Sequence, residues 1–207
     1  MDEPPLQPFA LNPAGAITGQ IDFNKVNHLK MHRRATSKLA EDTFDCVPED
    51  LYQFLKELGD RAAEYSWNDE VVGILMIPIP STDPALLVRH VNLLSNHGEI
   101  SMEDICMFKN TYIKGNSRSA QNCNMLYTCL MLSLSKAGKS KVAIWEEQYT
   151  IDHVKSGNLL LKTIIRELLL IQMHLLLPFA LNWVALIPTS PPSIATLQNL
   201  TPTYNAY

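Results

Sequence analysis

The sequence has little glycine and cysteine, and it lacks a targeting signal. Only 8 of its 207 residues are glycine, and no glycine-rich loop of the kind that cradles phosphate is present. The 4 cysteines are too few and too scattered for a disulfide framework, which predicts a reducing compartment. The N-terminus shows no basic start, apolar run and small-residue cleavage site, so we expect a cytoplasmic protein.

Motifs for catalysis and metal binding are also missing from the sequence. There is no Gly-x-Ser-x-Gly elbow, and Lys136–Ser140 ends like a P-loop without the earlier glycine or the preceding strand. We therefore interpret Gly138 as the C-cap of a helix. No closely spaced cysteine pair occurs, and His28 and His32, four residues apart, lack a third ligand. The sequence thus predicts no enzyme, no cofactor, no metal site and no small-molecule substrate.

Positive charge is scarce, and it is concentrated in two places. The net charge of −4 argues against a nucleic-acid binder that depends on overall positive charge. The candidates for weak RNA contacts are Lys30, Arg33 and Arg34 in the basic stretch Lys25–Lys38, and the group Lys136, Lys139 and Lys141. The alternative is a solvated helix face, because Glu41 and Asp42 follow the first stretch at once. We expect RNA binding by this chain to be weak and strongly salt-dependent.

Apolar spacing predicts an all-α fold, a compact bundle of six or seven short helices. Trp67–Pro80 is ambiguous between a short buried helix and a strand. The expected helices have these signals: a stripe of Val26, Leu29, Arg33 and Leu39; Pro48 before Leu51–Tyr65; Asp83-Pro84 to Gly98; a capping box at Ser101 with a stop at Gly115; Ser117 to Gly138; and the stretches Val142–Tyr149 and Asn158–Glu167. We expect Leu126, Leu130 and Leu134 to be buried against Phe54, Leu55 and Leu58.

Several blocks together resemble the Gag-like proteins of long-terminal-repeat retrotransposons, of the copia type. Order and spacing match over about residues 10–167, and the match depends on the number of blocks because none is a catalytic signature. The blocks are Leu11–Gly15, Leu51–Lys56 with Arg61-Ala62, Trp67–Pro78, Met125–Met131, Ser133–Lys139, Ile144–Ile151 and Leu159–Glu167.

This resemblance implies a helical, capsid-like assembly domain that associates with itself and packages the RNA of the retroelement. The chain departs from the pattern in two ways. It has no Cys-x2-Cys-x4-His-x4-Cys knuckle, which puts the RNA-gripping part of such proteins in doubt here. The resemblance also stops at Glu167, where the family would continue with a polar, charged helical segment.

The C-terminal part of the sequence has no charged residue. All 17 basic and 21 acidic residues lie at or before Glu167. We therefore expect a Pro-rich, irregular arm over residues 1–21, a helical domain over 22–167, and an aberrant tail over 168–207. Residues 168–187 include 16 apolar ones and are long enough to span a bilayer, although Pro178 interrupts them. A shifted reading frame and a buried pair of helices with a Pro-rich end are the other interpretations.

Three functions follow from these observations. The first is a non-enzymatic, Gag-like assembly protein that forms homo-oligomers and packages retroelement RNA, in a copy of the element that has decayed if the reading frame is shifted. The second is a membrane protein anchored through 168–187, whose helical domain binds a cytosolic partner. The third is a helical binding module without self-assembly.

Overall fold

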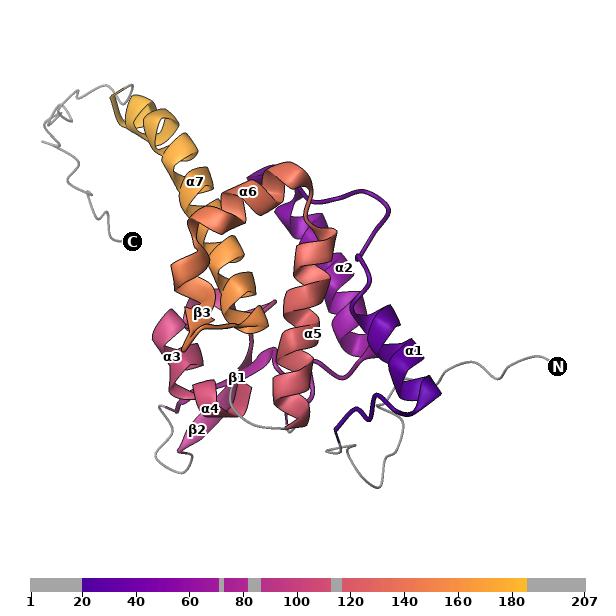
Figure 1. Ribbon diagram of the computed structural model, residues 1–207. Coiled ribbons are helices and arrows are strands. Elements are labelled where there is room, and N and C mark those ends of the chain that lie inside the picture. Colours follow the sequence, from indigo (N-terminus) through magenta and orange to yellow (C-terminus); the bar gives the residue numbers. More distant parts are fainter. Residues whose placement is uncertain (1–19, 71–72, 82–86, 113–116, 186–207) are drawn as a thin grey trace, which may run out of the picture. The chain divides into compact units, whose positions relative to one another are not determined.

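The computed structural model describes residues 20–70, 73–81, 87–112 and 117–185, without the side chains of residues 174–185. The described chain is mostly helical (Figure 1). Its helices are α1 (Val26–Ala35), α2 (Leu51–Glu64), α3 (Met102–Met107), α4 (Lys109–Tyr112), α5 (Arg118–Ser133), α6 (Lys136–Ile144) and α7 (Gly157–Ala185), with the 3₁₀ turns η1 (Pro48–Asp50), η2 (His97–Glu99) and η3 (Glu146–Tyr149). Its strands are β1 (Met76–Pro80), β2 (Val88–Asn92), β3 (Thr150–Ile151) and β4 (Val154–Lys155).

The chain divides into two compact units, Met1–Gln172 and Met173–Tyr207. Helix α7 runs across this division. Most of its described side chains belong to the first unit. The predicted arm over residues 1–21 lies almost wholly outside the described residues. Ile21, at its end, is buried, and its backbone exchanges two hydrogen bonds with the Gln121 side chain of α5.

The prediction of a helical fold is confirmed for most of the described chain, but the chain is not purely α-helical, because two small antiparallel strand pairs are present. Strand β1 pairs with β2, with Ile77 opposite Val91, and β3 pairs with β4. The predicted helix between Pro84 and Gly98 is therefore absent over β2, while Pro84 itself lies outside the described residues. The ambiguity of Trp67–Pro80 is resolved in favour of a strand over Met76–Pro80. The apolar residues of β1 are buried nearly throughout, which removes the alternation that identifies a strand in sequence.

Serine caps begin three of the helices. Ser101 and Asp104 form the predicted capping box of α3, with the Asp104 N–H donating to Ser101 Oγ at 3.0 Å. Ser117 caps α5 as expected and accepts from the Ala120 N–H at 3.1 Å. Helix α3 ends at Met107, and Gly115, its predicted stop, lies outside the described residues.

The predicted helix from Ser117 to Gly138 is in fact two helices. Leu134 is extended and forms a bridge with Phe44. The Phe44 N–H donates to the Ser133 carbonyl at 2.9 Å, and its own carbonyl accepts from the Ser135 N–H at 3.1 Å. These bonds replace those that a continuous helix would make, and Ser135 then caps α6. Gly138 is not a C-cap: it lies in the first turn of α6, where its N–H donates to Ser135 Oγ.

The core of the first unit contains the side chains that the apolar spacing predicted. Leu126, Leu130 and Leu134 are at most 1% exposed and share one apolar cluster with Phe54 and Leu58. Their predicted burial is confirmed, and only Leu55, packed at the edge of the cluster, is partly exposed. Stacking of the Phe44 ring on the Phe54 ring, with centroids 4.2 Å apart, ties the α1–α2 connection to α2.

The predicted stripe on the first helix is wrong. Helix α1 ends at Ala35, and it buries Met31 and Ala35, four residues apart, rather than Val26, which is 66% exposed. Leu39 packs against the core from the connection that follows the helix. Because basic side chains are interspersed with the few apolar ones in α1, the sequence did not show which face of the helix is buried.

Candidate functional site

The first group of predicted RNA contacts lies on α1. Arg33 is exposed, and Lys30 is half-buried. The Arg34 guanidinium lies 3.3 Å from Glu64 Oε1 of α2, so a nearby carboxylate partly neutralises its charge. Arg33 is therefore the member of this group that is most accessible to a phosphate.

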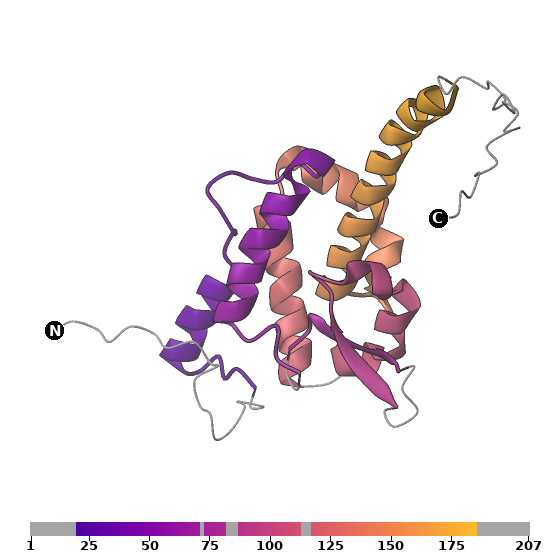
Figure 2. The ribbon, with the colours of Figure 1, turned by 180° about the vertical axis from the view of Figure 1, so that it is seen from behind.

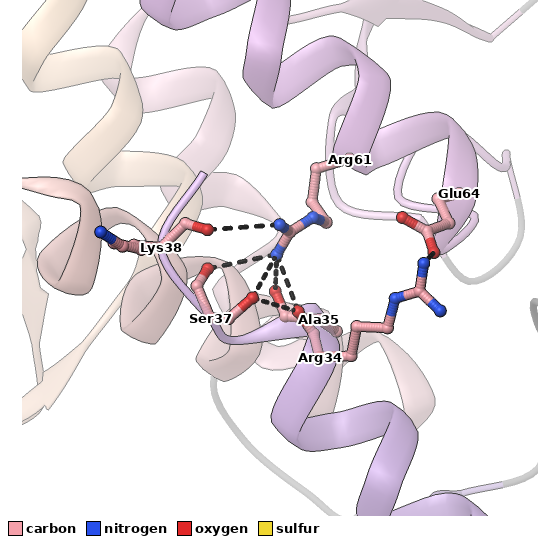
Figure 3. A network of polar contacts seen from close by, with 6 residues as sticks. All are labelled: Arg34, Ala35, Ser37, Lys38, Arg61 and Glu64. Atoms are coloured by element: carbon pink, nitrogen blue, oxygen red, sulfur yellow. Dashed lines mark hydrogen bonds and ion pairs between the residues drawn. The ribbon is translucent and has the colours of Figure 1, made fainter. Parts of the chain in front are cut away.

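Arg61 of α2 closes the C-terminal end of α1, a role that the sequence analysis did not assign. Its Nη1 donates to the carbonyls of Arg34 at 2.8 Å and of Ala35 and Ser37 at 3.1 Å, and Nη2 donates to the Lys38 carbonyl at 3.4 Å (Figure 3). The last carbonyls of a helix lack intrahelical hydrogen-bond donors and carry partial negative charge. A guanidinium supplies both the donors and a compensating positive charge. Arg61 thus fixes α1 and the start of the α1–α2 connection to α2.

The second group lies on α6, where one of its three lysines has a structural role. Lys141 Nζ donates to the carbonyls of Asp45 at 3.0 Å and Cys46 at 2.9 Å, which holds the segment before η1 against α6. Lys136 and Lys139 are exposed. Helices α1 and α6 lie at separate places in the first unit, as both views show, so the two groups do not form one basic surface (Figures 1 and 2).

A pocket of about 460 Å³ opens between α2 and the α1–α2 connection. Its lining includes the acids Glu41, Asp42, Asp50 and Glu57 and no basic residue. Lys38 Nζ pairs with Glu41 at 3.1 Å, and Gln53 donates to Glu57 at 2.8 Å. The negative charge of this lining disfavours phosphate, so the pocket adds nothing to an RNA-binding surface.

The cysteines have the properties of structural thiols. Burial raises the pKa of Cys46 to about 12 and that of Cys129 to about 11, and it also raises the pKa of the wholly buried Cys123 and of the half-buried Cys106. A raised pKa keeps the thiol protonated and unreactive. Within the described ranges no three His, Cys, Asp or Glu side chains gather where they could hold a metal ion.

The predicted histidine pair on α1 is engaged in other contacts. His28 Nδ1 accepts from the Asp22 N–H at 3.0 Å, and the His32 ring packs edge-on against Phe23 with centroids 5.1 Å apart. Burial, followed by the nearby charge of Arg118, lowers the pKa of His32. These contacts orient the two rings for packing at the start of the described chain.

The side chains of helix α7 change from buried to exposed shortly after Glu167. Leu168 is fully buried in the core, whereas Leu170, Ile171 and Met173 are 44%, 43% and 62% exposed. Of the predicted span 168–187, residues 186 and 187 lie outside the described part. None of the helices in the described part combines the length and apolarity needed to cross a bilayer.

Comparison of the chain with family models, curated proteins and solved structures finds no match. The features available for assigning a function are therefore the sequence blocks, the two small basic groups and the exposed apolar side chains of α7. Exposed apolar side chains also occur on other elements, among them Val26 on α1 and Ile144 on α6.

Proposed function

We propose that this chain is a non-enzymatic structural protein of the Gag type from a long-terminal-repeat retrotransposon. In this proposal it associates with itself in the cytoplasm and contributes to packaging of the element's RNA. The observation that carries the proposal is the exposure of Leu170, Ile171 and Met173 at the start of an uncharged helical stretch. An apolar helix surface that the rest of the fold does not cover favours association with another protein surface.

The shape of the core supports a scaffold role. The first unit buries a continuous apolar cluster that extends from Ile21 to Leu168, which gives a rigid body able to hold an interaction surface in place. The four thiols and the histidine pair are occupied in packing and hydrogen bonding, and the proposal assigns no reaction to them.

RNA has a secondary part in the proposal. Of the six candidate side chains, Arg34 is paired with Glu64 and Lys141 is bonded to backbone carbonyls. Lys30 is half-buried, which leaves Arg33, Lys136 and Lys139 as exposed cations, too few for tight binding through release of counterions. Packaging would then depend on many weak contacts summed over an assembly.

Light scattering on the full chain tests self-association. The expected result is an apparent mass that rises with protein concentration. A monomer at every concentration and salt level would contradict the proposal and favour a helical binding module. The genomic DNA gives an independent test, because flanking long terminal repeats and a downstream protease and reverse transcriptase are expected for a retroelement.

A further inference from the structure

We infer that the outer edge of β2 pairs with the same edge of a second copy of this chain, antiparallel and with His90 opposite His90. The β1–β2 pairs of the two copies then form one four-stranded sheet across a two-fold axis. The inference rests on the proposed self-association and names a surface for it. In both views β1 and β2 lie at the periphery of the first unit (Figures 1 and 2).

The hydrogen bonds between β1 and β2 show which backbone groups of β2 point outward. In an antiparallel pair, residues that exchange hydrogen bonds with the partner strand alternate with residues whose N–H and C=O groups point away from it. The Leu93 N–H donates to the Leu75 carbonyl at 2.7 Å, and the Ser81 N–H donates to the Leu87 carbonyl at 3.4 Å. In this register the bonded residues are the odd-numbered ones, so the even-numbered residues of β2 point their backbone groups outward.

The outward groups belong to Val88, His90 and Asn92. Within the described part of the chain, no group bonds the backbone of Val88 or His90 from this side. The Asn92 carbonyl accepts from the Asn96 N–H at 2.9 Å, so the turn after β2 marks the end of the open edge. Val88 is 43% exposed, and His90 is exposed as well. An exposed strand edge with unused donors and acceptors is a template for another strand.

The outer edge of β1 is blocked by prolines. Pro78 lies opposite His90 and Pro80 lies opposite Val88, so both prolines occupy positions that point away from β2. A proline has no N–H to donate, and an edge strand accepts it at such positions. Because β1 lacks these two donors, β2 provides the edge that can pair. When two copies join through β2, β1 is the outermost strand on both sides, so pairing at this surface stops at a dimer.

The charge pattern of β2 suits a second copy as the occupant. An axis at His90 matches the outward groups of both strands and places Arg89 opposite Val91 of the other copy. The Arg89 guanidinium keeps its own partner, Glu99, at 2.6 Å. An axis at Arg89 would instead oppose two guanidinium groups, which is unfavourable. The arrangement at His90 is thus self-complementary in both hydrogen bonding and charge.

The shortness of β2 sets the expected strength of the contact. The strand has 5 residues, Val88–Asn92. A pair of such strands buries far less than the roughly 1,600 Å² of a standard interface. We therefore expect reversible dimerisation that depends on concentration, and not a permanent dimer.

Sedimentation velocity on the full chain and on His90→Pro tests the pairing. The variant removes an outward N–H at the position opposite Pro78, so the ladder with β1 keeps its hydrogen bonds. The dimer loses two hydrogen bonds, one from each copy, which should weaken dimerisation about tenfold. The urea midpoint should stay close to that of the wild type. The matched control is His90→Ala, which keeps the N–H and should associate like the wild type.

Disulfide cross-linking identifies the occupant and the register. With the axis at residue 90, the Cα atoms of the two copies of this residue lie about 5.5 Å apart, within reach of a disulfide. His90→Cys should therefore form a covalent dimer on mild oxidation. The matched control is Val88→Cys, whose two copies lie about 14 Å apart along the strands and should not cross-link. The wild type, with the half-buried Cys106, gives the background.

The outcomes separate the inference from the proposed function. Unchanged association of His90→Pro would overturn the inference and leave self-association standing. Weakened association without cross-linking of His90→Cys, or equal cross-linking of both cysteine variants, would also overturn it, because β2 would then meet a different surface. If His90→Pro proves unstable, cross-linking alone decides. A wild type that is monomeric at every concentration would contradict both.

Discussion

The Arg61 guanidinium of α2 lies 2.8 Å from the carbonyl oxygen of Arg34 in the last turn of α1. Through this contact and those to Ala35, Ser37 and Lys38, one side chain satisfies a helix end and the start of the following connection. The Arg34 side chain meanwhile pairs with Glu64, one turn further along α2. Two arginines that look equivalent in the sequence therefore have different roles, one in fixing backbone and one in a surface ion pair.

Removing the Arg61 contacts should destabilise the fold. We expect Arg61→Ala to lower the free energy of unfolding by about 1–3 kcal/mol, because carbonyls at the end of α1 lose a charged donor. Arg61→Lys should recover only part of this loss, since an ammonium cannot reach several carbonyls from one planar group. Urea denaturation measures both, with the exposed Arg33→Ala as control; equal stabilities for Arg61→Ala and Arg33→Ala would show that the contacts contribute nothing.

The centre of α5 provides a matched pair of leucines. Leu130 is fully buried and Leu132 is 50% exposed, two residues apart on the same helix. We expect Leu130→Ala to cost about 2–5 kcal/mol of unfolding free energy and Leu132→Ala much less, because only the first leaves a cavity. Chemical denaturation of the two variants checks this. A similar loss in both would mean that α5 is not central to the core.

Two helical glycines should respond in opposite ways to alanine. A Cβ on Gly138 would lie 2.5 Å from the Phe44 carbonyl oxygen, whereas a Cβ on Gly59 of α2 would meet only Leu94 Cδ1 at 3.8 Å. Gly138→Ala should therefore destabilise the protein by separating α6 from the Phe44 segment. Gly59→Ala should stabilise it by about 0.4–1 kcal/mol, through reduced entropy of the unfolded chain. Thermal unfolding distinguishes them, and a stabilised Gly138→Ala would contradict the close packing of α6.

The cysteines should react slowly in the folded protein. Because burial raises the pKa of all four thiols, nearly all of each is protonated at pH 8, and the thiolate is the reactive form. We expect Cys106, the least buried, to react first with a disulfide reagent, and the other three only on unfolding. Time courses with and without denaturant, followed by peptide mapping, check the order. Rapid labelling of Cys123 in the native protein would contradict its burial.

RNA binding should be weak and should depend on two lysines of α6. We expect Lys136→Gln with Lys139→Gln to lower the residual affinity at low salt without changing stability, because both ammonium groups are exposed. Lys141→Gln should instead lower stability, since Lys141 holds the Asp45 and Cys46 carbonyls. Filter binding and denaturation separate these effects. Submicromolar binding at about 0.15 M salt, where the Debye length is roughly 8 Å, would make the chain an RNA reader in its own right.

The sequence by itself determined features that depend on neighbouring residues. The capping box at Ser101, the cap at Ser117 and the burial of Leu126, Leu130 and Leu134 follow from residue type and helical spacing, and the structure confirms them. These features are readable because hydrogen bonds between a cap and its first turn, and the 3.6-residue period, involve positions only a few residues apart.

Tertiary structure alone decided where distant segments replace local bonds. The Phe44 backbone ends α5 and allows α6 to begin, from about 90 residues away, and β2 is a strand because β1 lies beside it. Arg61 and Lys141 have structural roles because carbonyls remote in sequence lie within their reach. A hydrogen bond between segments far apart leaves no periodic signal in the sequence, so only the folded chain shows which charged side chains are used to hold the fold together and which remain exposed.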